Sequence, residues 1–395
     1  MLRFDFNTYV DKFIEKDDYN ELLNQKEEII SKFNSASMIG WTKDAEKSEI
    51  EDLKETGKYI KESFDCLVVI GIGGSFLGSY AFDKMFRNYF NDSKYEIIYA
   101  GTTLSAKYLD ELLEYLKNKN FCINVISKSG STMETNITYK VLKDLLKEKF
   151  NDNFKDHIIV TTDSSKGPLR EEVKKEGYKS FIIPDDIGGR YSFLTPAHLL
   201  PLSINYDLDE IVKGYYEGKD LIDKAYEYAV IRNLLFKSGK YIENYVVYEE
   251  NMTYFLEWLK QLFGESEGKE GLGIYPTSTL HTRDLHSLGQ FIQEGNKILF
   301  ETFIKVDNSP HKISYENRDL HEINNIVLES VIKAHYSGNV PCLEISVDSL
   351  SIENISSLIY FFMLSAAFSS LLFGVDPFNQ PGVEVYKSEV RESLK

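Results

Sequence analysis

The sequence predicts an α/β protein with two doubly wound parallel sheets, each in three α/β/α layers, and with helical segments at both ends of the chain. Three observations support this prediction. Short, wholly apolar runs alternate with stretches of helical periodicity. Repeated β-α-β units with apolar strands are typical of parallel sheets that are buried on both faces. The chain also has 395 residues, 43% of them hydrophobic, which is enough to fill two cores of ordinary size.

The first half of the chain shows the clearer alternation. Its expected strands are five short apolar runs, residues 66–70, 96–100, 122–126, 157–161 and 181–183. Stretches of helical periodicity lie between them, for example around residues 77–85. Together they predict one doubly wound domain with the strand order 2-1-3-4-5, in which the first and third strands are neighbours.

The second half repeats this pattern less regularly. Its expected strands are residues 245–248, 299–306 and 342–347, and its expected helices are residues 226–236, 254–263, 284–293, 320–335 and 353–373. Prolines in the stretch 193–203 mark the expected crossing between the domains. The predicted domains are an N-terminal helical segment at 1–53, a first α/β domain at 54–192, a second at 193–375, and a C-terminal helix at 376–395 that returns to the functional site.

Composition and charge argue against several classes of protein. The net charge of −17 is spread along the chain and opposes nucleic-acid binding. Cys66, Cys122 and Cys342 lie in or beside apolar runs, so we expect buried thiols and a reducing compartment. The N-terminal stretch lacks the apolar core of a signal peptide, and we expect a cytoplasmic protein. Residues 355–375 carry no charge, but five serines and the lack of flanking Lys or Arg favour a buried helix over a membrane span.

A glycine-rich turn follows the first expected strand, in LVVIGIGGSFLGSY at residues 67–80. The dinucleotide pattern would need a third glycine in place of Phe76, and the next strand would need to end in an acid, but it ends in Gly101. The P-loop pattern is also absent. Gly74 and Ser75, at the start of the next helix, therefore form a candidate anion site, although such glycines can also serve close packing alone.

A second hydroxyl-rich loop follows the third expected strand and favours the functional interpretation. The stretch SKSGSTMET at residues 127–135 places hydroxyls and amides at the start of another helix, which suits a phosphate. Because the first and third strands are neighbours, both loops meet at one crevice. Lys128 would either pair locally or supply charge. The predicted phosphate ligands are Gly74, Ser75, Ser127, Lys128, Ser129 and Thr132.

These two loops resemble those of the sugar isomerase (SIS) fold, and three further stretches resemble the phosphoglucose isomerase family in particular. The stretches are DDIGGRYS at 185–192, GESEGK at 264–269 and DPFNQPGVEVYK at 376–387. The resemblance covers nearly the whole chain. It implies an isomerase that needs no cofactor and interconverts glucose 6-phosphate and fructose 6-phosphate through a cis-enediolate, in glycolysis and gluconeogenesis.

Glu265 is the candidate catalytic base. It follows Gly264, which we expect to end the preceding helix and leave the carboxylate on a loop. A carboxylate on a fixed scaffold can remove the proton beside a carbonyl and return it to the neighbouring carbon. The resemblance implies this role for Glu265 and a substrate contact for Gln261. Composition alone would make Glu265 an ordinary surface acid, with three competitors, Glu267, Glu294 and Glu301.

His286 is the candidate for opening the sugar ring. It lies in DLHSLGQFIQEG, which predicts a helix with Gln290 on the same face. A lone helical histidine is more often structural or exposed. The resemblance implies that His286 acts on the active site of the adjacent subunit, so that the protein works as a homodimer. His281 is close enough in sequence to be confused with it.

Two basic residues complete the candidate site. The resemblance implies that Lys387, in the expected last helix, assists ring opening, whereas by itself it would be an ordinary solvated lysine. Arg190 follows two glycines and would stabilise the enediolate oxygen, or would pair with Asp185 or Asp186. The histidines are scattered and no paired-cysteine pattern occurs, so no metal site is expected.

Two other functions stay open at this stage. One is a non-catalytic protein that senses sugar phosphates, which would have no reason to keep Glu265, His286 and Lys387 together. The other is an isomerase that also accepts mannose 6-phosphate, since that choice depends on the shape of the pocket near C2. The short polar stretch at 305–326 leaves the dimer surface undefined.

Overall fold

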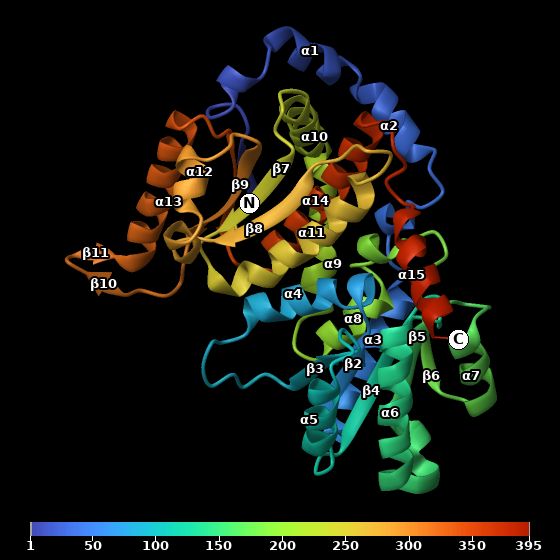
Figure 1. Cartoon of the computed structure of the whole chain (residues 1–395). Coiled ribbons are helices and arrows are strands. Elements are labelled where there is room, and N and C mark those ends of the chain that lie inside the picture. The colour runs from blue at the N-terminus through green and yellow to red at the C-terminus, as the bar shows by residue number, and fades with distance from the viewer. Residues whose placement is uncertain (1, 395) are drawn as a thin grey trace. The chain divides into compact units, whose positions relative to one another are not determined.

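The computed structural model describes residues 2–394 and consists of two compact units, each with its own sheet (Figure 1). The first unit comprises residues 37–212, and the second, called here the terminal unit, comprises residues 1–36 and 213–395. Each unit contains a five-stranded sheet with helices around it, which confirms the predicted α/β class. The domain boundaries expected after residues 53, 192 and 375 stay a prediction.

The sheet of the 37–212 unit is wholly parallel. Its strands are β2 (Cys66–Ile70), β3 (Glu96–Ala100), β4 (Phe121–Ile126), β5 (Ile158–Thr162) and β6 (Lys179–Ile182). They are arranged in the order β3-β2-β4-β5-β6. This is the predicted doubly wound order, and it makes β2 and β4 neighbours, so that the loops following them start at the same edge of the sheet.

Helices cover both faces of this sheet. They are α3 (Lys47–Ser63), α4 (Leu77–Phe86), α5 (Ala106–Leu116), α6 (Met133–Phe150), α7 (Pro168–Glu176) and α8 (Pro196–Ser203). Cys66, Val68 and Ile70 of β2 belong to one core with residues of α5, α6 and α7. Because side chains alternate along a strand, the equally buried Leu67 and Val69 face the opposite side. Figure 1 shows α6 lying across β4 on the near face.

The terminal unit has a mixed sheet. Its strands are β1 (Leu2–Asp5), β7 (Ile242–Val247), β8 (Tyr275–Leu280), β9 (Leu299–Asn308) and β12 (Cys342–Ser349). Their order is β1-β12-β9-β7-β8, with β1 antiparallel to β12 and the other pairs parallel. The three expected strands are present. The two edge strands, β1 and β8, were not predicted, because one has four residues and the other, YPTSTL, carries a proline and three Ser or Thr residues.

The helices of the terminal unit come from both ends of the chain. They are α1 (Lys16–Asn24), α2 (Lys26–Asn34), α10 (Ile222–Lys237), α11 (Thr253–Glu267), α12 (Gly289–Glu294), α13 (Leu320–Ser337), α14 (Ile352–Leu372) and α15 (Gly382–Ser393). The helix α9 (Leu208–Glu217) joins the units, and a small hairpin pairs β10 (Ser314–Tyr315) with β11 (Arg318–Asp319).

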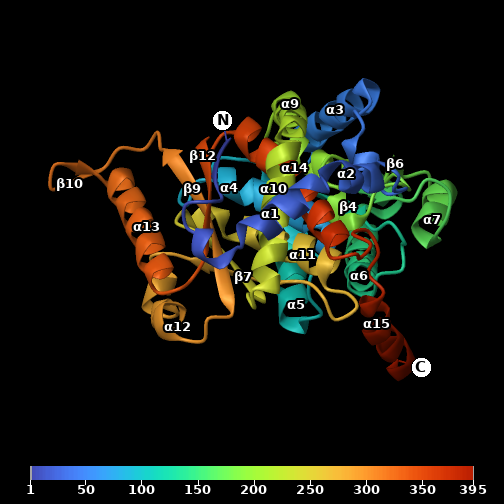
Figure 2. The ribbon, with the colours of Figure 1, turned by 90° about the horizontal axis from the view of Figure 1, so that it is seen from above.

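The apolar helix α14 is the core of this unit. It contacts α2, α10 and α11 (Figure 2), and every residue from Ile355 to Ser370 is buried. Within residues 2–394 it is the one helix long and apolar enough to cross a membrane, and 89% of its most apolar window is buried inside the protein. The hydroxyls of Ser365 and Ser370 donate to carbonyls one turn earlier, at 2.8 and 2.7 Å, which satisfies these polar groups within the core. The interpretation of residues 355–375 as a buried helix is confirmed.

Candidate functional site

The glycine-rich turn after β2 is packed against the DDIGGRYS loop. Gly73, Gly74 and Ser75 form a 3₁₀ turn that leads into α4, and Gly73 has a φ of 56°, in the left-handed region that favours glycine. A Cβ atom on Gly74 would lie 2.2 Å from the carbonyl carbon of Gly189. The two loops therefore touch backbone to backbone, and only glycine fits at position 74. Close packing and a ligand site are compatible here, because Ser75 stays partly exposed beside this contact.

The loop after β4 presents its hydroxyls at the start of α6. The Oγ atom of buried Ser127 accepts a hydrogen bond from the amide of Gly130 at 3.1 Å, which shapes the turn. Ser129 is exposed, and its Oγ accepts from the amide of Ser131. Thr132 precedes the helix, and its hydroxyl caps no helix amide. The Ser129 and Thr132 hydroxyls thus lie at the positive end of an 18-residue helix, where an anion is favoured.

Thr135 is a candidate that the sequence interpretation missed. It lies in the first turn of α6 with none of its surface exposed, and its hydroxyl has no partner within the described chain. A buried hydroxyl without a partner is uncommon and is a candidate for binding a ligand or an ordered water. Its spacing of three from Thr132 places both threonines on one face of the helix, a signal that SKSGSTMET already contained.

Lys128 is bound locally. Its ammonium donates to the carbonyls of Pro184, Asp185 and Ile187 at 2.9, 3.1 and 3.0 Å, and partial burial lowers the pKa of Lys128. An ammonium has three protons, so these carbonyls account for all of them. Of the two roles left open for this lysine, local pairing is the one that its contacts support. It fixes the start of the DDIGGRYS loop.

Arg190 lies in that loop, within the 3₁₀ turn Gly189–Tyr191. It is only 3% exposed, and its guanidinium carbon lies 5.6 Å from the centre of the Tyr191 ring. Asp186, one of its two possible partners, forms an ion pair with Lys43 at 2.6 Å. The loops bearing Gly74, Lys128 and Arg190 thus form one connected group in the 37–212 unit.

Glu265 lies on a helix, not on a loop as expected. The helix α11 extends to Glu267, and Gly264 lies inside its last turn. The helix ends instead at Gly268, whose amide donates to the Gly264 carbonyl at 3.1 Å. A glycine near a helix end allows termination but does not enforce it, and here the buried carboxylate of Glu267 holds the last turn in place.

Glu265 and Gln261 are brought together by this longer helix. The Nε2 atom of Gln261 donates to Oε1 of Glu265 at 3.2 Å, as expected for side chains four residues apart on a helix. The Oε1 atom of Gln261 is buried and has no partner within residues 2–394. Glu265 itself is partly buried. Its carboxylate is therefore held by a neighbour while it stays accessible.

Two of the three other glutamates considered as the catalytic base are buried in the core and bonded there. Glu267 is fully buried and forms two hydrogen bonds with Arg232, which also binds Glu243 at 2.8 Å. Glu301 is fully buried and accepts from Asn244 at 3.0 Å and from a ring nitrogen of His335. A base for a dissolved substrate has to be reachable, so neither carboxylate qualifies.

The third competitor, Glu294, lies on the exposed part of α12. Its Oε2 atom accepts from the Nε2 atom of Gln290 at 2.7 Å, in a pair of surface side chains. It is accessible, so its contacts do not exclude it as a base.

His286 does not lie on the expected helix 284–293. The chain forms a 3₁₀ turn at Arg283–His286, and α12 starts only at Gly289. The turn is fixed by Asp284, whose Oδ2 accepts from the amide of Leu280 at 2.8 Å. The proposed shared helix face with Gln290 is therefore wrong. His286 is exposed, which a residue that acts on another subunit would have to be.

His281 is distinguished from His286 by burial. It is 2% exposed, its ring packs against Tyr248 and Phe303, and its Nε2 atom lies 3.2 Å from the Thr279 hydroxyl. Burial lowers the pKa of His281 to about 4, so the ring is neutral at neutral pH. This histidine belongs to the core.

Lys387 lies on α15, as expected. Its ammonium pairs with Glu384 at 3.0 Å, and none of the residues of this helix is buried. The pairing lowers the pKa of Glu384. Within the described chain, these contacts are those of a solvated lysine, and a catalytic role for Lys387 rests on the family pattern.

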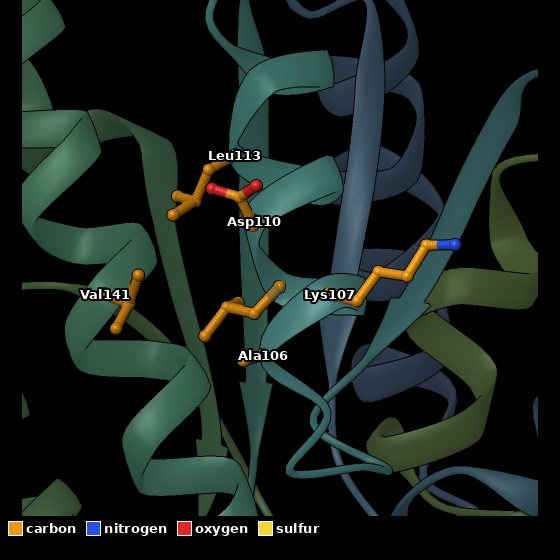
Figure 3. A pocket seen from close by; sticks show the side chains of 6 residues that line it. Ala106, Lys107, Asp110, Leu113 and Val141 are labelled. Atoms are coloured by element: carbon orange, nitrogen blue, oxygen red, sulfur yellow. The ribbon is translucent and has the colours of Figure 1, made fainter.

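One groove lies outside all of these residues. It has a volume of about 580 Å³ and is lined by Ala106, Lys107, Leu109, Asp110, Leu113 and Val141. Figure 3 shows Val141 of α6 facing α5, with the Lys107 side chain directed away from it. An apolar lining with a single carboxylate does not suit a phosphate. Among residues 2–394, no group of three or more His, Cys, Asp or Glu side chains is arranged to hold a metal ion.

Comparison with solved structures assigns the fold to the class of sugar isomerase proteins. A hypothetical protein from Thermus thermophilus matches with a TM-score of 0.90 and 26% identity over 100% of both chains. A glucose-6-phosphate isomerase from Chlamydia trachomatis matches with a TM-score of 0.83 and 19% identity, covering 96% of this chain and 86% of that one. The latter similarity concerns the fold alone.

Sequence comparison narrows this class to one family. Residues 38–323 match the model of the family described as phosphoglucose isomerase. The glucose-6-phosphate isomerase of Mycoplasmopsis pulmonis is 42% identical over an alignment of 415 positions, covering 97% of both chains. That of Staphylococcus epidermidis is 42% identical over 379 positions, covering 89% of this chain and 86% of the relative. The chain belongs to the phosphoglucose isomerase family.

Proposed function

We propose that this chain is an aldose–ketose isomerase that interconverts D-glucose 6-phosphate and D-fructose 6-phosphate, a step of glycolysis and gluconeogenesis. The observation that carries the proposal is the 42% identity to a glucose-6-phosphate isomerase over 97% of both chains. The contacts of Glu265, Gln261 and Lys128 support the roles proposed for them, whereas the role of Lys387 rests on the family pattern.

The 37–212 unit supplies the proposed phosphate site. Gly74, Ser75, Ser127, Ser129 and Thr132 are its proposed ligands, and Thr135 is added because its hydroxyl is buried without a partner in the described chain. Lys128 acts on this site by holding the segment that precedes Arg190. The support comes from two neighbouring strands whose following loops present amides and hydroxyls at helix starts.

The proposed reaction moves one proton between two carbons. His286 and Lys387 open the sugar ring by passing a proton between the C1 hydroxyl and the ring oxygen. Glu265 then takes the proton from C2 of the aldose, and the electron pair forms the C1–C2 double bond of the enediolate while Arg190 stabilises its oxygen. The protonated Glu265 returns the proton to C1, and the proton of the C2 hydroxyl passes to the C1 oxygen, which leaves a carbonyl at C2 and yields the ketose. Gln261 orients the Glu265 carboxylate.

We further propose a cytoplasmic homodimer in which His286 acts on the partner's substrate. The exposed histidine is surrounded in sequence by exposed apolar side chains, Leu288 at 46% and Phe291 at 50%, and Tyr275 on edge strand β8 is 70% exposed. Exposed apolar side chains are favoured at subunit contacts, where a partner covers them. Three free, buried cysteines agree with a reducing compartment. A sizing column checks the dimer.

The decisive test is an assay of purified protein with fructose 6-phosphate, coupled to a glucose 6-phosphate dehydrogenase. Replacing Glu265 by Gln removes the proposed base but keeps the hydrogen bond to Gln261 possible, so kcat should fall by about 10²–10⁴-fold. Glu294→Gln, which changes an exposed carboxylate of the same unit, is the control and should keep full activity.

Two outcomes would contradict the proposal. Wild-type protein that binds fructose 6-phosphate without turning it over would be a sensor. An active Glu265→Gln variant would mean that another group moves the proton. Solvent deuterium should appear at C2 of the product glucose 6-phosphate, which a direct hydride shift would not give.

A further inference from the structure

A buried histidine connects three parts of the 37–212 unit around the glycine-rich turn. His198 lies in α8 and is 2% exposed. Its Nδ1 atom lies 3.0 Å from the backbone nitrogen of Ser79, and its Nε2 atom lies 2.8 Å from the carbonyl oxygen of Gly74. Because an amide can only donate and a carbonyl can only accept, Nδ1 is the acceptor and Nε2 carries the proton. The ring is thus a neutral imidazole of defined tautomer.

The first of these bonds caps a helix. Ser79 is the third residue of α4, and its amide is one of the four that a helix start leaves without a partner inside the helix. The residue at the N-cap is Phe76, which offers no capping side chain. The imidazole supplies the missing acceptor, and its ring lies close against Gly78, where a Cβ atom would be 3.0 Å from Cε1.

The second bond holds the carbonyl of Gly74. The Oγ atom of Ser192 is also within reach of this carbonyl, at 3.1 Å, but it lies only 2.6 Å from the carbonyl of Gly189. A hydroxyl has one proton, and we assign it to the shorter contact, the one with the carbonyl of Gly189. The Gly74 carbonyl therefore depends on His198 for its strongest hydrogen bond.

We propose that His198 is a positioning residue of the phosphate site. The peptide unit that joins Gly74 to Ser75 is planar, so fixing its carbonyl oxygen fixes the position from which the Ser75 side chain leaves the backbone. The hydrogen bond from Nε2 thereby sets the direction of the Ser75 hydroxyl and keeps the turn pressed against the Arg190 loop. This role rests on the proposed function, since it needs the phosphate to bind at Ser75.

Two substitutions separate the two hydrogen bonds. In His198→Asn the amide oxygen takes the place of Nδ1, so the helix cap can form but the donor to Gly74 is lost. In His198→Gln the amide nitrogen reaches the place of Nε2, so the donor to Gly74 is restored. We expect the inhibition constant of inorganic phosphate and the KM of fructose 6-phosphate to rise about tenfold in His198→Asn, the size of one lost hydrogen bond. They should return toward the wild-type values in His198→Gln, while kcat changes less than KM in both.

His157 offers a matched control in the same unit. It too is buried, and its Nδ1 atom lies 2.8 Å from the carbonyl oxygen of Phe121, the first residue of β4. This contact is far in sequence from the glycine-rich turn. His157→Phe and His198→Phe should both lower the thermal unfolding temperature. Only His198→Phe should weaken phosphate binding. Equal weakening in both variants would mean that His198 acts through stability alone, and would overturn the proposal.

A further variant separates this proposal from the one it rests on. If Ser75→Ala leaves the inhibition constant of phosphate unchanged, the assignment of phosphate to this turn is wrong, and the positioning role falls with it. If Ser75→Ala weakens phosphate binding but His198→Asn does not, the assignment of phosphate to this turn is supported and the positioning role of His198 is wrong.

A measurement on the wild-type protein covers the case in which the His198 variants do not fold. With ¹⁵N-labelled histidine, the Nε2 proton of His198 should give a slowly exchanging NMR signal, because it is buried and bonded to Gly74. Titration with inorganic phosphate should shift this signal. No shift at saturating phosphate would overturn the proposal.

Discussion

At the scale of single residues, burial separates carboxylates that the sequence makes equivalent. Glu265 and Glu267 are two positions apart on α11, yet the first is partly buried beside Gln261 and the second has no exposed surface and is bonded to Arg232. A proton-transfer group needs both a fixed position and access to the substrate. Only Glu265 of this pair has both.

Lys128 gives a prediction at this scale. Replacing it by Met removes three charge-assisted hydrogen bonds to the carbonyls of the 184–187 segment. We expect a loss of about 1–3 kcal/mol in the free energy of unfolding, because partly buried carbonyls lose their donor. The KM should rise as well, since this segment leads into Arg190. Urea denaturation and steady-state kinetics measure the two effects.

Lys166 is the control for the Lys128→Met substitution. It is exposed and lies in the loop after β5 of the same unit. Lys166→Met should leave both the stability and the KM close to wild type. If Lys128→Met raised KM without any loss of stability, a direct contact of the ammonium with the phosphate would explain the result better than positioning.

At the scale of elements, the end of α11 depends on a buried ion network. Arg232 of α10 binds Glu267 of α11 and Glu243 of β7, and all three side chains are fully buried. The hydroxyl of Tyr245 also donates to Glu243, at 2.8 Å. The network joins two helices and a strand, and it holds the turn of α11 that carries Glu265.

Replacing Arg232 by Met should destabilise the protein strongly. It would leave two carboxylates buried without their cation, and breaking such a pair costs about 3–5 kcal/mol. The activity per folded molecule should also fall, because the last turn of α11 loses its anchor. Lys260→Met on α11 is the control, since the ion pair of Lys260 with Glu257 is partly exposed and is worth about 0.5 kcal/mol. Similar unfolding midpoints for both variants would contradict the assigned role of the network.

At the scale of the whole molecule, two buried histidines predict a loss of stability in acid. Burial lowers the pKa of both His198 and His281 to about 4 from the usual 6.5. Between these values the unfolded chain binds protons that the folded protein does not, so stability falls as the pH is lowered from 6.5 to 4. Each histidine contributes a slope of up to about 1.4 kcal/mol per pH unit. Below pH 4 this contribution has been lost completely.

Thermal unfolding between pH 7 and pH 5 checks this expectation. The unfolding temperature should fall steadily with pH, and His281→Asn should make its dependence shallower because one titrating group is removed. An unfolding temperature that does not change over this range would show that neither imidazole is held neutral by the fold.

Much of the fold could be predicted from the sequence because the signals are local. The apolar runs of β2 to β6 and the helical periods between them are properties of adjacent residues, and the predicted strand order is confirmed. The edge strands β1 and β8 could not be predicted, since their short or polar sequences become strands only by pairing with β12 and β7. The end of α11 was misplaced for a similar reason, because Glu267 is fixed by a residue 35 positions away.

The sequence by itself determined the α/β class, the strand order of the 37–212 unit and, through its motifs, the family to which the chain belongs. These three conclusions depend on the periodicity of hydrophobic residues and on short motifs, which are local properties of the sequence. The tertiary structure decided which glutamates are accessible, that Lys128 is bound by three carbonyls, and that His198 holds the Gly74 turn. Such facts depend on burial and on hydrogen bonds between residues up to 124 positions apart, and no local pattern encodes them.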